Sequence, residues 1–164
     1  MNTPDDIYKK VLQRLNEYLE ANNMRKTPER QEVLSAICRM KTIFTQVELA
    51  DFMEHESQFC VSRSTLFHTL DTLVDARILL KHSLSRAAAY ELLVVAVPRA
   101  YLVCQTCGEI RLLERPELIK YLGTVKARLF SVRQPLLYLH GECKKCVQRA
   151  RKNKKTSLQT IKRT

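Results

Sequence analysis

The sequence predicts an α+β fold with an N-terminal winged helix and a C-terminal mixed α/β domain. Two observations lead to this prediction: four helix-start signals followed by a hairpin pattern in the first half, and two C-x-x-C pairs among strand-like segments in the second. At 164 residues, 45% of them hydrophobic, the chain has the length of one ordinary domain or two small ones. We place the domains at 1–93 and 99–147, with a hinge at 94–98 and a basic tail at 148–164.

Four helix-start signals recur before residue 76. Each places a capping residue ahead of apolar residues at helical spacing. The capping residues are Thr3, Thr27, Thr45 and Ser62, with proline at the first helical position after Thr3 and Thr27. The last two helices, roughly 45–56 and 62–75, are joined by a short connection. This arrangement predicts a helix-turn-helix whose second helix can enter a major groove.

The hydrophobic period changes after residue 76. Residues 78–80 and 89–92 predict two strands around a polar turn, which is the hairpin of a winged helix. Residues 100–104 and 109–113 predict strands on either side of the first cysteine pair. Pro116 opens a further helix and residues 136–140 predict a last strand, so the second half is mixed α and β.

Four cysteines, Cys104, Cys107, Cys143 and Cys146, form two C-x-x-C pairs. This spacing lets two tight turns supply four thiolates to one zinc ion per subunit. The alternatives are four unrelated free thiols or a redox-active pair. The polar, acidic start of the chain shows no signal pattern, which indicates a reducing, cytoplasmic location where disulfides are rare. Four sulfurs saturate the ion, so we expect a structural site and not a catalytic one.

The formal net charge of +11 is unevenly distributed. Residues 1–93 hold 12 Lys or Arg against 13 Asp or Glu, whereas residues 94–164 hold 16 against 4. The excess indicates an anionic partner, and we expect the tail to be a solvated, partly disordered extension that adds sequence-independent attraction to phosphates. The longest apolar run, 92–97, is too short to span a bilayer. With glycine only at 108, 123 and 141, a glycine-rich phosphate loop is missing and we expect no enzyme.

Four ordered motifs carry a resemblance to a known family: residues 24–30 (MRKTPER), 64–70 (STLFHTL), 101–108 (YLVCQTCG) and 137–143 (LYLHGEC). Together they make the chain, over about residues 10–146, similar to the ferric uptake regulator family. The resemblance implies a bacterial, dimeric, metal-linked transcriptional repressor with an N-terminal winged helix and a C-terminal dimerisation domain. It also implies double-stranded DNA with a palindromic operator as the partner, and target genes for metal, haem or oxidative-stress functions.

Carried over by position, the family's DNA contacts fall on residues before the second helix and at the start of the fourth. They are Arg25, Arg63, Ser64, Thr65, Phe67 and His68. Phe67 stands where the family usually has tyrosine, so it keeps an apolar contact to thymine methyls and loses a hydroxyl. His68 stands where arginine is usual, and an imidazole carries less charge at neutral pH. We therefore expect affinity or site preference to differ from typical relatives.

The larger departure concerns the family's regulatory metal site, which is usually rich in histidine. Its positions here read residues 97–101 (VPRAY), Ile43 and Pro135, none of which offers an imidazole. Glu91 survives, with Glu114 or Glu117 as possible substitutes, and such oxygen-only remnants make a poor iron or zinc site. Two versions stay open: DNA binding that is constitutive or answers to haem or oxidation, and a rearranged Fe²⁺ or Mn²⁺ site around Glu91.

The remaining histidines and cysteines get simpler interpretations. His55, His68, His82 and His140 are scattered, and we expect surface or hydrogen-bonded residues. Cys38 and Cys60 fit small buried apolar positions, although an exposed Cys60 could serve as a redox or haem contact. The alternative function is a zinc-stabilised interaction module that binds protein or nucleic acid without sequence-specific repression.

Overall fold

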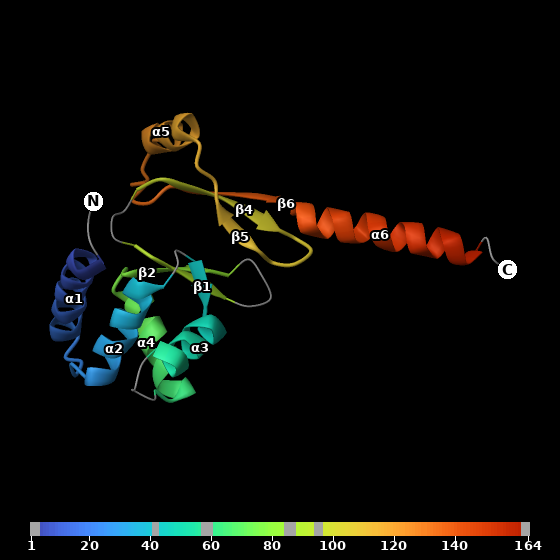
Figure 1. Ribbon diagram of the computed structural model, residues 1–164. Coiled ribbons are helices and arrows are strands. Elements are labelled where there is room, and N and C mark those ends of the chain that lie inside the picture. Colours follow the sequence, from blue (N-terminus) through green and yellow to red (C-terminus); the bar gives the residue numbers. More distant parts are fainter. Residues whose placement is uncertain (1–3, 41–42, 57–60, 84–87, 94–96, 162–164) are drawn as a thin grey trace. The chain divides into compact units, whose positions relative to one another are not determined.

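The structure is a computed structural model, and it describes residues 4–40, 43–56, 61–83, 88–93 and 97–161, the last eight of these by their backbone only. The chain separates into two compact units, Met1–Ala96 and Val97–Thr164 (Figure 1). The predicted cap Thr3, residues 94–96 of the predicted hinge and Cys60 lie outside the described residues. No helix in the described ranges combines the length and apolar character needed to cross a membrane.

Four helices form most of the N-terminal unit: α1 (Pro4–Ala21), α2 (Pro28–Arg39), α3 (Gln46–Glu56) and α4 (Arg63–Asp75). Each turns an apolar face into one common core. The side chains buried there include Leu15, Leu19, Leu34, Ile37, Leu49, Leu70 and Leu73. They recur every three or four residues along the helices, which is the periodicity that predicted these elements, and the four helices are confirmed.

The helix starts follow the predicted caps. Thr27 caps α2 and Ser62 caps α4, each accepting a hydrogen bond from the backbone N–H three residues ahead, at 3.5 and 3.1 Å. Thr45 and Glu48 form a reciprocal capping box at the start of α3. The Glu48 carboxylate accepts from the Thr45 N–H at 2.7 Å, and the Thr45 hydroxyl accepts from the Glu48 N–H at 3.2 Å. These bonds satisfy backbone donors that a helix leaves without intrahelical partners.

A small antiparallel sheet completes the N-terminal unit. It contains β1 (Ile43–Thr45), β2 (Leu79–His82) and β3 (Ala89–Leu92) in the order β1-β3-β2. The strands β2 and β3 form the predicted hairpin, so α3, α4 and this hairpin make up a winged helix. The sequence did not predict β1, because a three-residue strand becomes stable only through its pairing with β3. On the core face, the rings of Phe44 and Tyr90 stack with centroids 6.0 Å apart.

The C-terminal unit contains β4 (Arg99–Cys104), β5 (Ile110–Leu112), α5 (Pro116–Thr124), β6 (Leu136–Gly141) and α6 (Lys144–Ile161). Its sheet has the order β5-β4-β6, with β4 antiparallel to β5 and parallel to β6. Among the described residues of this unit, the buried apolar side chains are Ala100, Tyr101, Val103, Cys104 and Cys146. The large exposed ones include Leu102, Leu112, Tyr121, Val125, Leu129, Phe130 and Leu139.

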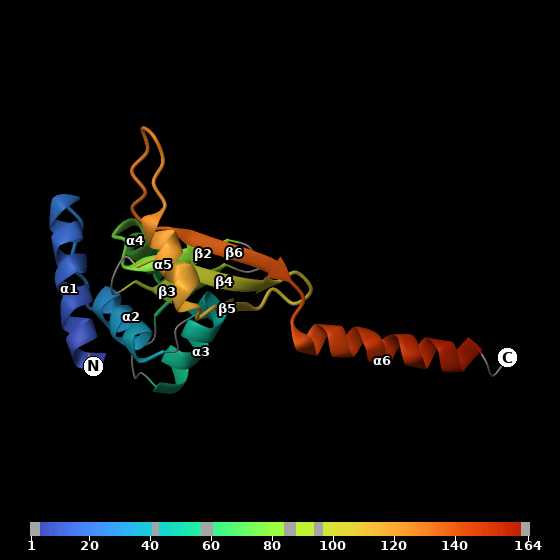
Figure 2. The same ribbon diagram turned by 90° about the horizontal axis from the view of Figure 1, so that it is seen from above.

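Helix α6 includes most of the segment 148–164 for which the charge pattern predicted a partly disordered tail, so that expectation was wrong for residues 148–161. Within the C-terminal unit the helix extends from the end of β6 away from the sheet (Figure 2). Its composition explains the outcome, because residues 144–161 contain neither glycine nor proline and are rich in lysine, arginine and glutamine. These residues have high helix propensity, which a net charge does not remove.

Candidate functional site

The two C-x-x-C pairs lie at the ends of two adjacent parallel strands. Cys104 is the last residue of β4 and is in register with Gly141, the last residue of β6. Because parallel strands end at the same edge of a sheet, the pairs meet there although Cys107 and Cys143 are 36 positions apart. The N–H of Gln105 donates to the carbonyl of Gly141 at 2.8 Å, which joins the first pair to the end of β6.

The four sulfurs converge on one point. All four Sγ atoms lie within 4.8 Å of one another, and the Sγ atoms of Cys107 and Cys143 are 3.8 Å apart. A tetrahedral zinc site with Zn–S bonds of about 2.3 Å has S···S edges of about 3.8 Å. A disulfide would need about 2.05 Å. The cluster can therefore hold a structural zinc ion, and the described cysteines are free thiols.

Local turns position the cysteine thiol groups of both pairs. After the first pair, Gly108 takes a φ of 77°, a left-handed conformation that glycine adopts without steric cost. Its N–H donates to the carbonyl of Cys104 at 2.8 Å, and the N–H of Cys104 donates to the carbonyl of Glu109 at 2.9 Å. In the second pair, the carbonyl of Cys143 accepts from the N–H of Val147 at 3.1 Å. The second pair is therefore built into the first turn of α6.

Hydrogen bonds within the cluster favour the thiolate at Cys104 and the protonated thiol at Cys146. The backbone N–H of Cys143 lies 3.3 Å from the sulfur of Cys104, and this hydrogen bond, followed by one from the backbone of Cys107, lowers the pKa of Cys104 to about 6. Hydrogen bonding with the Cys143 thiol raises the pKa of Cys146 to about 12. In the metal-free chain the thiols therefore share protons, and these protons would be displaced when zinc binds.

Two polar interactions support the cluster, and the sequence did not reveal either. The Thr106 hydroxyl donates to the Glu142 carboxylate at 3.0 Å, which joins the two cysteine turns through side chains. Arg111 donates to Glu109 at 2.6 and 2.8 Å and attracts Cys143 and Cys107 electrostatically. A four-thiolate zinc site carries net negative charge, so a guanidinium beside it reduces the cost of assembling the sulfurs. In the sequence, these two interactions were indicated only by polar residues within or beside each C-x-x-C pair.

The predicted DNA-contacting residues of α4 lie mostly on its exposed face. Arg63, Ser64, Phe67 and His68 are exposed, whereas the opposite face of the helix is packed in the core. Phe67 keeps 44% of its surface accessible, so it is not a core residue. Its ring meets the ring of His68 edge to face, with centroids 5.9 Å apart. The exposed face therefore combines an aromatic ring with basic and hydroxyl groups.

Thr65 and Arg25 are positioned differently. Thr65 is half-buried, and its hydroxyl lies 2.9 Å from the hydroxyl of Ser62, so it belongs to the cap of α4. Arg25 is exposed in the turn between α1 and α2, and its carbonyl accepts a hydrogen bond from the Arg30 guanidinium. This hydrogen bond joins the backbone at Arg25 to α2. Arg25 therefore belongs to the turn between α1 and α2 and not to α4.

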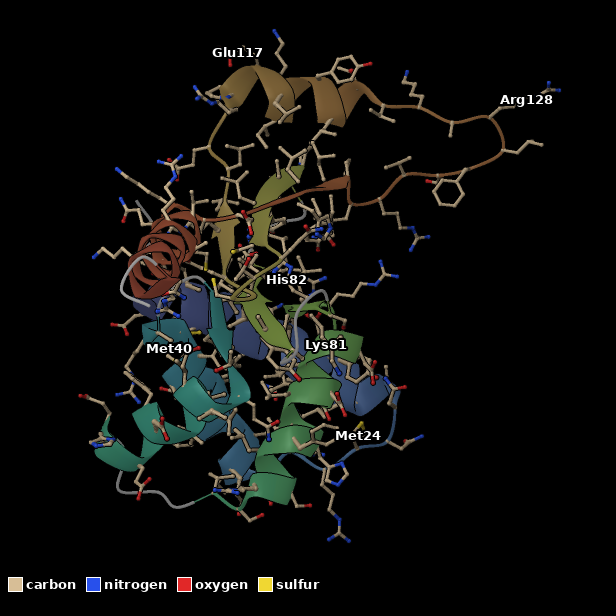
Figure 3. All side chains as sticks on the ribbon, turned by 90° about the vertical axis from the view of Figure 1, so that its right-hand side faces the viewer. Met24, Met40, Lys81, His82, Glu117 and Arg128 are labelled. Carbon is tan, nitrogen blue, oxygen red and sulfur yellow. The ribbon has the colours of Figure 1, made fainter. Side chains whose placement is uncertain are left out.

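An ion pair that the sequence did not predict lies next to the exposed face of α4. The Lys81 ammonium is 3.5 Å from the Asp71 carboxylate, one turn beyond Phe67. Lys81 and His82 follow each other on β2 and leave the strand on opposite faces (Figure 3). Lys81 thus reaches α4 and offsets the negative charge of Asp71.

The predicted remnants of a regulatory metal site have other surroundings. Glu91 is fully buried, and its carboxylate lies 3.3 Å from Nε2 of His82, which is also fully buried. Ile43 is in register with Glu91 across β1 and β3, and Glu114 is exposed after β5. Within the described ranges, the four cysteines are the one group of three or more His, Cys, Asp or Glu residues arranged to hold a metal. A metal at Glu91 or Glu114 stays a prediction.

The chain matches the Ferric uptake regulator family over residues 21–140. The Ferric uptake regulation protein of Campylobacter jejuni is 24% identical over 141 residues, which are 85% of this chain and 90% of that protein. The ferric uptake regulator of Pseudomonas aeruginosa, solved with manganese, has a similar fold (TM-score 0.64, 20% identity, 79% of this chain and 97% of that one). The ferric uptake regulator of Helicobacter pylori also has a similar fold (TM-score 0.65, 22% identity, 85% of this chain and 93% of that one). Because the family match spans well over half of its residues, the chain belongs to the ferric uptake regulator family.

Proposed function

We propose that this member of a family of transcriptional regulators is a sequence-specific repressor that binds a palindromic operator as a homodimer and controls metal, haem or oxidative-stress genes. The observation that supports this best is the exposed face of α4. An α-helix with its side chains is about 10–12 Å wide, which matches a major groove about 12 Å wide. The other face of α4 is anchored in the core, so the exposed side chains are held at a rigid surface.

Each exposed side chain of α4 has a chemical role in this proposal. Arg63 and Ser64 stand in the first turn, where a helix N-terminus also attracts phosphates, and they can reach the backbone or base edges. Phe67 offers an apolar contact to a thymine methyl, and His68 offers a ring nitrogen to a base edge or phosphate. The pairing of Asp71 with Lys81 removes most of the repulsion that a lone carboxylate would exert on phosphates.

The test is selection from a pool of random duplexes, followed by affinity measurements on the selected sequence. The double variant Arg63→Ala with His68→Ala should bind the selected duplex at least about 5- to 150-fold more weakly, since each good contact to a base is worth about 1–3 kcal/mol and the variant removes up to two. The matched control is Arg115→Ala with His55→Ala, which removes the same residue types from exposed positions outside α4. Full affinity of the α4 variant, or no enrichment of any sequence by the parent chain, would refute the proposal.

Homodimerisation is supported by the apolar surface of the C-terminal unit. Leu102 and Leu139 are register partners on neighbouring strands, and both are 42% exposed. A contiguous apolar surface of this kind marks an interaction site more often than a free surface. Sedimentation of the full chain should give a dimer, and replacement of both leucines by glutamate should shift it to monomer. If the parent chain sediments as a monomer, the proposed binding of a homodimer to a palindromic operator is refuted.

For regulation, we propose that DNA binding needs the structural zinc but no further divalent ion. This is supported by the fully buried contact between Glu91 and His82 and by the absence of imidazoles at Ile43 and Pro135. The test is metal titration of the zinc-loaded protein during binding to the selected duplex. Added Fe²⁺ or Mn²⁺ should leave the affinity unchanged. A rise in affinity that Glu91→Gln abolishes would support the rearranged site instead.

A further inference from the structure

Helix α6 has the most uniform charge of any element in the chain. Nine Lys or Arg and no Asp or Glu follow Glu142 in the sequence, and seven of the nine belong to α6. A helix without acidic residues cannot form the i, i+4 ion pairs that usually balance basic side chains. No acidic side chain within α6 therefore balances its positive charge.

The position of α6 within its unit leaves this charge accessible. The helix has 18 residues, which corresponds to a length of about 27 Å, and it extends from the end of β6 away from the sheet (Figures 1 and 2). Lys144, Lys145, Arg149 and Arg151 are all exposed. These basic side chains all project from one helix.

The cysteine cluster determines which way the helix faces. Cys146 is only 8% exposed, and its side of the helix faces the other three sulfurs. Successive helical residues are about 100° apart, so Lys144 and Arg151 lie about 140° or more around the helix from Cys146. Arg149 lies about 60° from it, at the border of the two sides. The cluster thus turns most of the basic side chains away from the unit to which α6 is attached.

Nucleic-acid phosphates fit this helix better than a membrane surface does. A helix that lies in a bilayer interface needs a broad apolar face with Trp, Phe or Leu. The apolar residues of α6 are Cys146, Val147, Ala150, Leu158 and Ile161, of which one is leucine and none is aromatic, and Cys146 belongs to the sulfur cluster. Arginine and lysine on a polar helix are the groups that contact DNA phosphates without reading sequence.

We infer that α6 is a second DNA-binding element, which contacts the phosphates of duplex DNA without sequence preference. The inference rests on the proposed DNA-binding function and assigns to this helix a share of the affinity that α4 does not supply. Each phosphate contact contributes about 0.9 to the slope of log K against log salt. If Arg149 and Arg151 each neutralise one phosphate, their removal should lower that slope by about 1.8. Between 50 and 200 mM salt the parent chain should then lose about 12-fold more affinity than the variant.

The test uses the full-length, zinc-loaded protein and a random 40-base-pair duplex, with affinity measured by fluorescence anisotropy across that salt range. The variant Arg149→Gln with Arg151→Gln keeps helix propensity, since glutamine and arginine are similar helix formers. The control Arg115→Gln with Arg128→Gln removes the same charge from exposed residues of the same unit, Arg128 being at the tip of the loop after α5 (Figure 3). The α6 variant should show the flatter slope and the control the parental one.

Equal slopes in both variants would overturn the inference, because net charge alone would then explain the binding. A second experiment measures binding to phosphatidylserine vesicles. If the α6 variant loses vesicle binding while its slope of log K against log salt for DNA is unchanged, the inference is also overturned, in favour of a membrane role. The selectivity of the parent chain for its selected duplex over random duplex reports on α4 separately. If that selectivity is missing while the slope still depends on Arg149 and Arg151, the proposed function fails and the role of α6 stands.

Discussion

Loss of a single zinc ligand should unfold the C-terminal unit and leave the N-terminal unit folded. The two units differ in how they are stabilised. In the described part of the N-terminal unit, seventeen buried apolar residues form the core cluster. In the described part of the C-terminal unit, Tyr101 and Val103 are the large apolar side chains that are buried without being metal ligands. The perturbation is Cys146→Ser, which removes a sulfur from the cluster and keeps the size of the side chain.

The magnitudes indicate which contribution dominates. Full burial of a side chain such as Tyr101 or Val103 stabilises by about 1.5–3 kcal/mol, so the two together supply roughly 3–6 kcal/mol. Zinc binding at a structural four-ligand site supplies an apparent 10–16 kcal/mol, approximately. We therefore expect β4 and β6 to stay paired only when the metal is bound.

Hydrogen exchange with mass spectrometry separates the two units within one molecule. Peptides from β4 and β6 should lose protection in Cys146→Ser, and peptides from α1 and α4 should keep it. The control is Cys38→Ser, the same substitution at a thiol outside the cluster, and it should keep both the zinc content and the protection. Chelation of zinc from the parent chain should reproduce the effect of Cys146→Ser. Protected β4 and β6 amides in a chain shown by elemental analysis to lack zinc would refute the reasoning.

Two further predictions concern the N-terminal unit. Ser62→Ala should lower the free energy of unfolding, measured in urea, by about 1 kcal/mol. Ser62→Gly should lower it by only about a few tenths of a kcal/mol, because a glycine N-cap lets water reach the free N–H groups. Equal losses in the two variants would contradict a capping role for Ser62. Burial raises the pKa of Cys38 from 9.0 to about 11, so between these values the folded thiol keeps a proton that the unfolded one releases. Stability should then fall with rising pH in that window. The fall should be shallower in Cys38→Ser, and parallel pH profiles would show that Cys38 is not the titrating group.

Much of the fold was predictable because its signals are local. The capping box of Thr45 and Glu48 and the cap at Ser62 each depend on residues three positions apart. The two C-x-x-C pairs are equally local, and they predicted which four sulfurs come together in a cluster that could hold zinc. Composition was a weaker guide, since the basic residues of the tail, 148–164, indicated disorder where the backbone up to residue 161 forms α6.

The features that were missed depend on contacts between distant segments. Strand β1 exists because Ile43 pairs with Glu91, which no pattern within three residues can reveal. Thr106 meets Glu142 across 36 positions, and Lys81 meets Asp71 between a strand and a helix. Each of these pairs needs the sheet or the helix packing to exist first, so polar residues on their own carried no readable signal.

The sequence by itself determined where helices begin, which faces are apolar and which sulfurs are offered to a metal, because these follow from spacings of a few residues. Only the tertiary structure decided that β4 and β6 run parallel and bring Cys104 and Cys143 to one edge. It also decided that Phe67 faces outward while Glu91 is enclosed. The physical reason is that local propensity acts along the chain, whereas burial and strand pairing depend on which distant segments come to lie side by side.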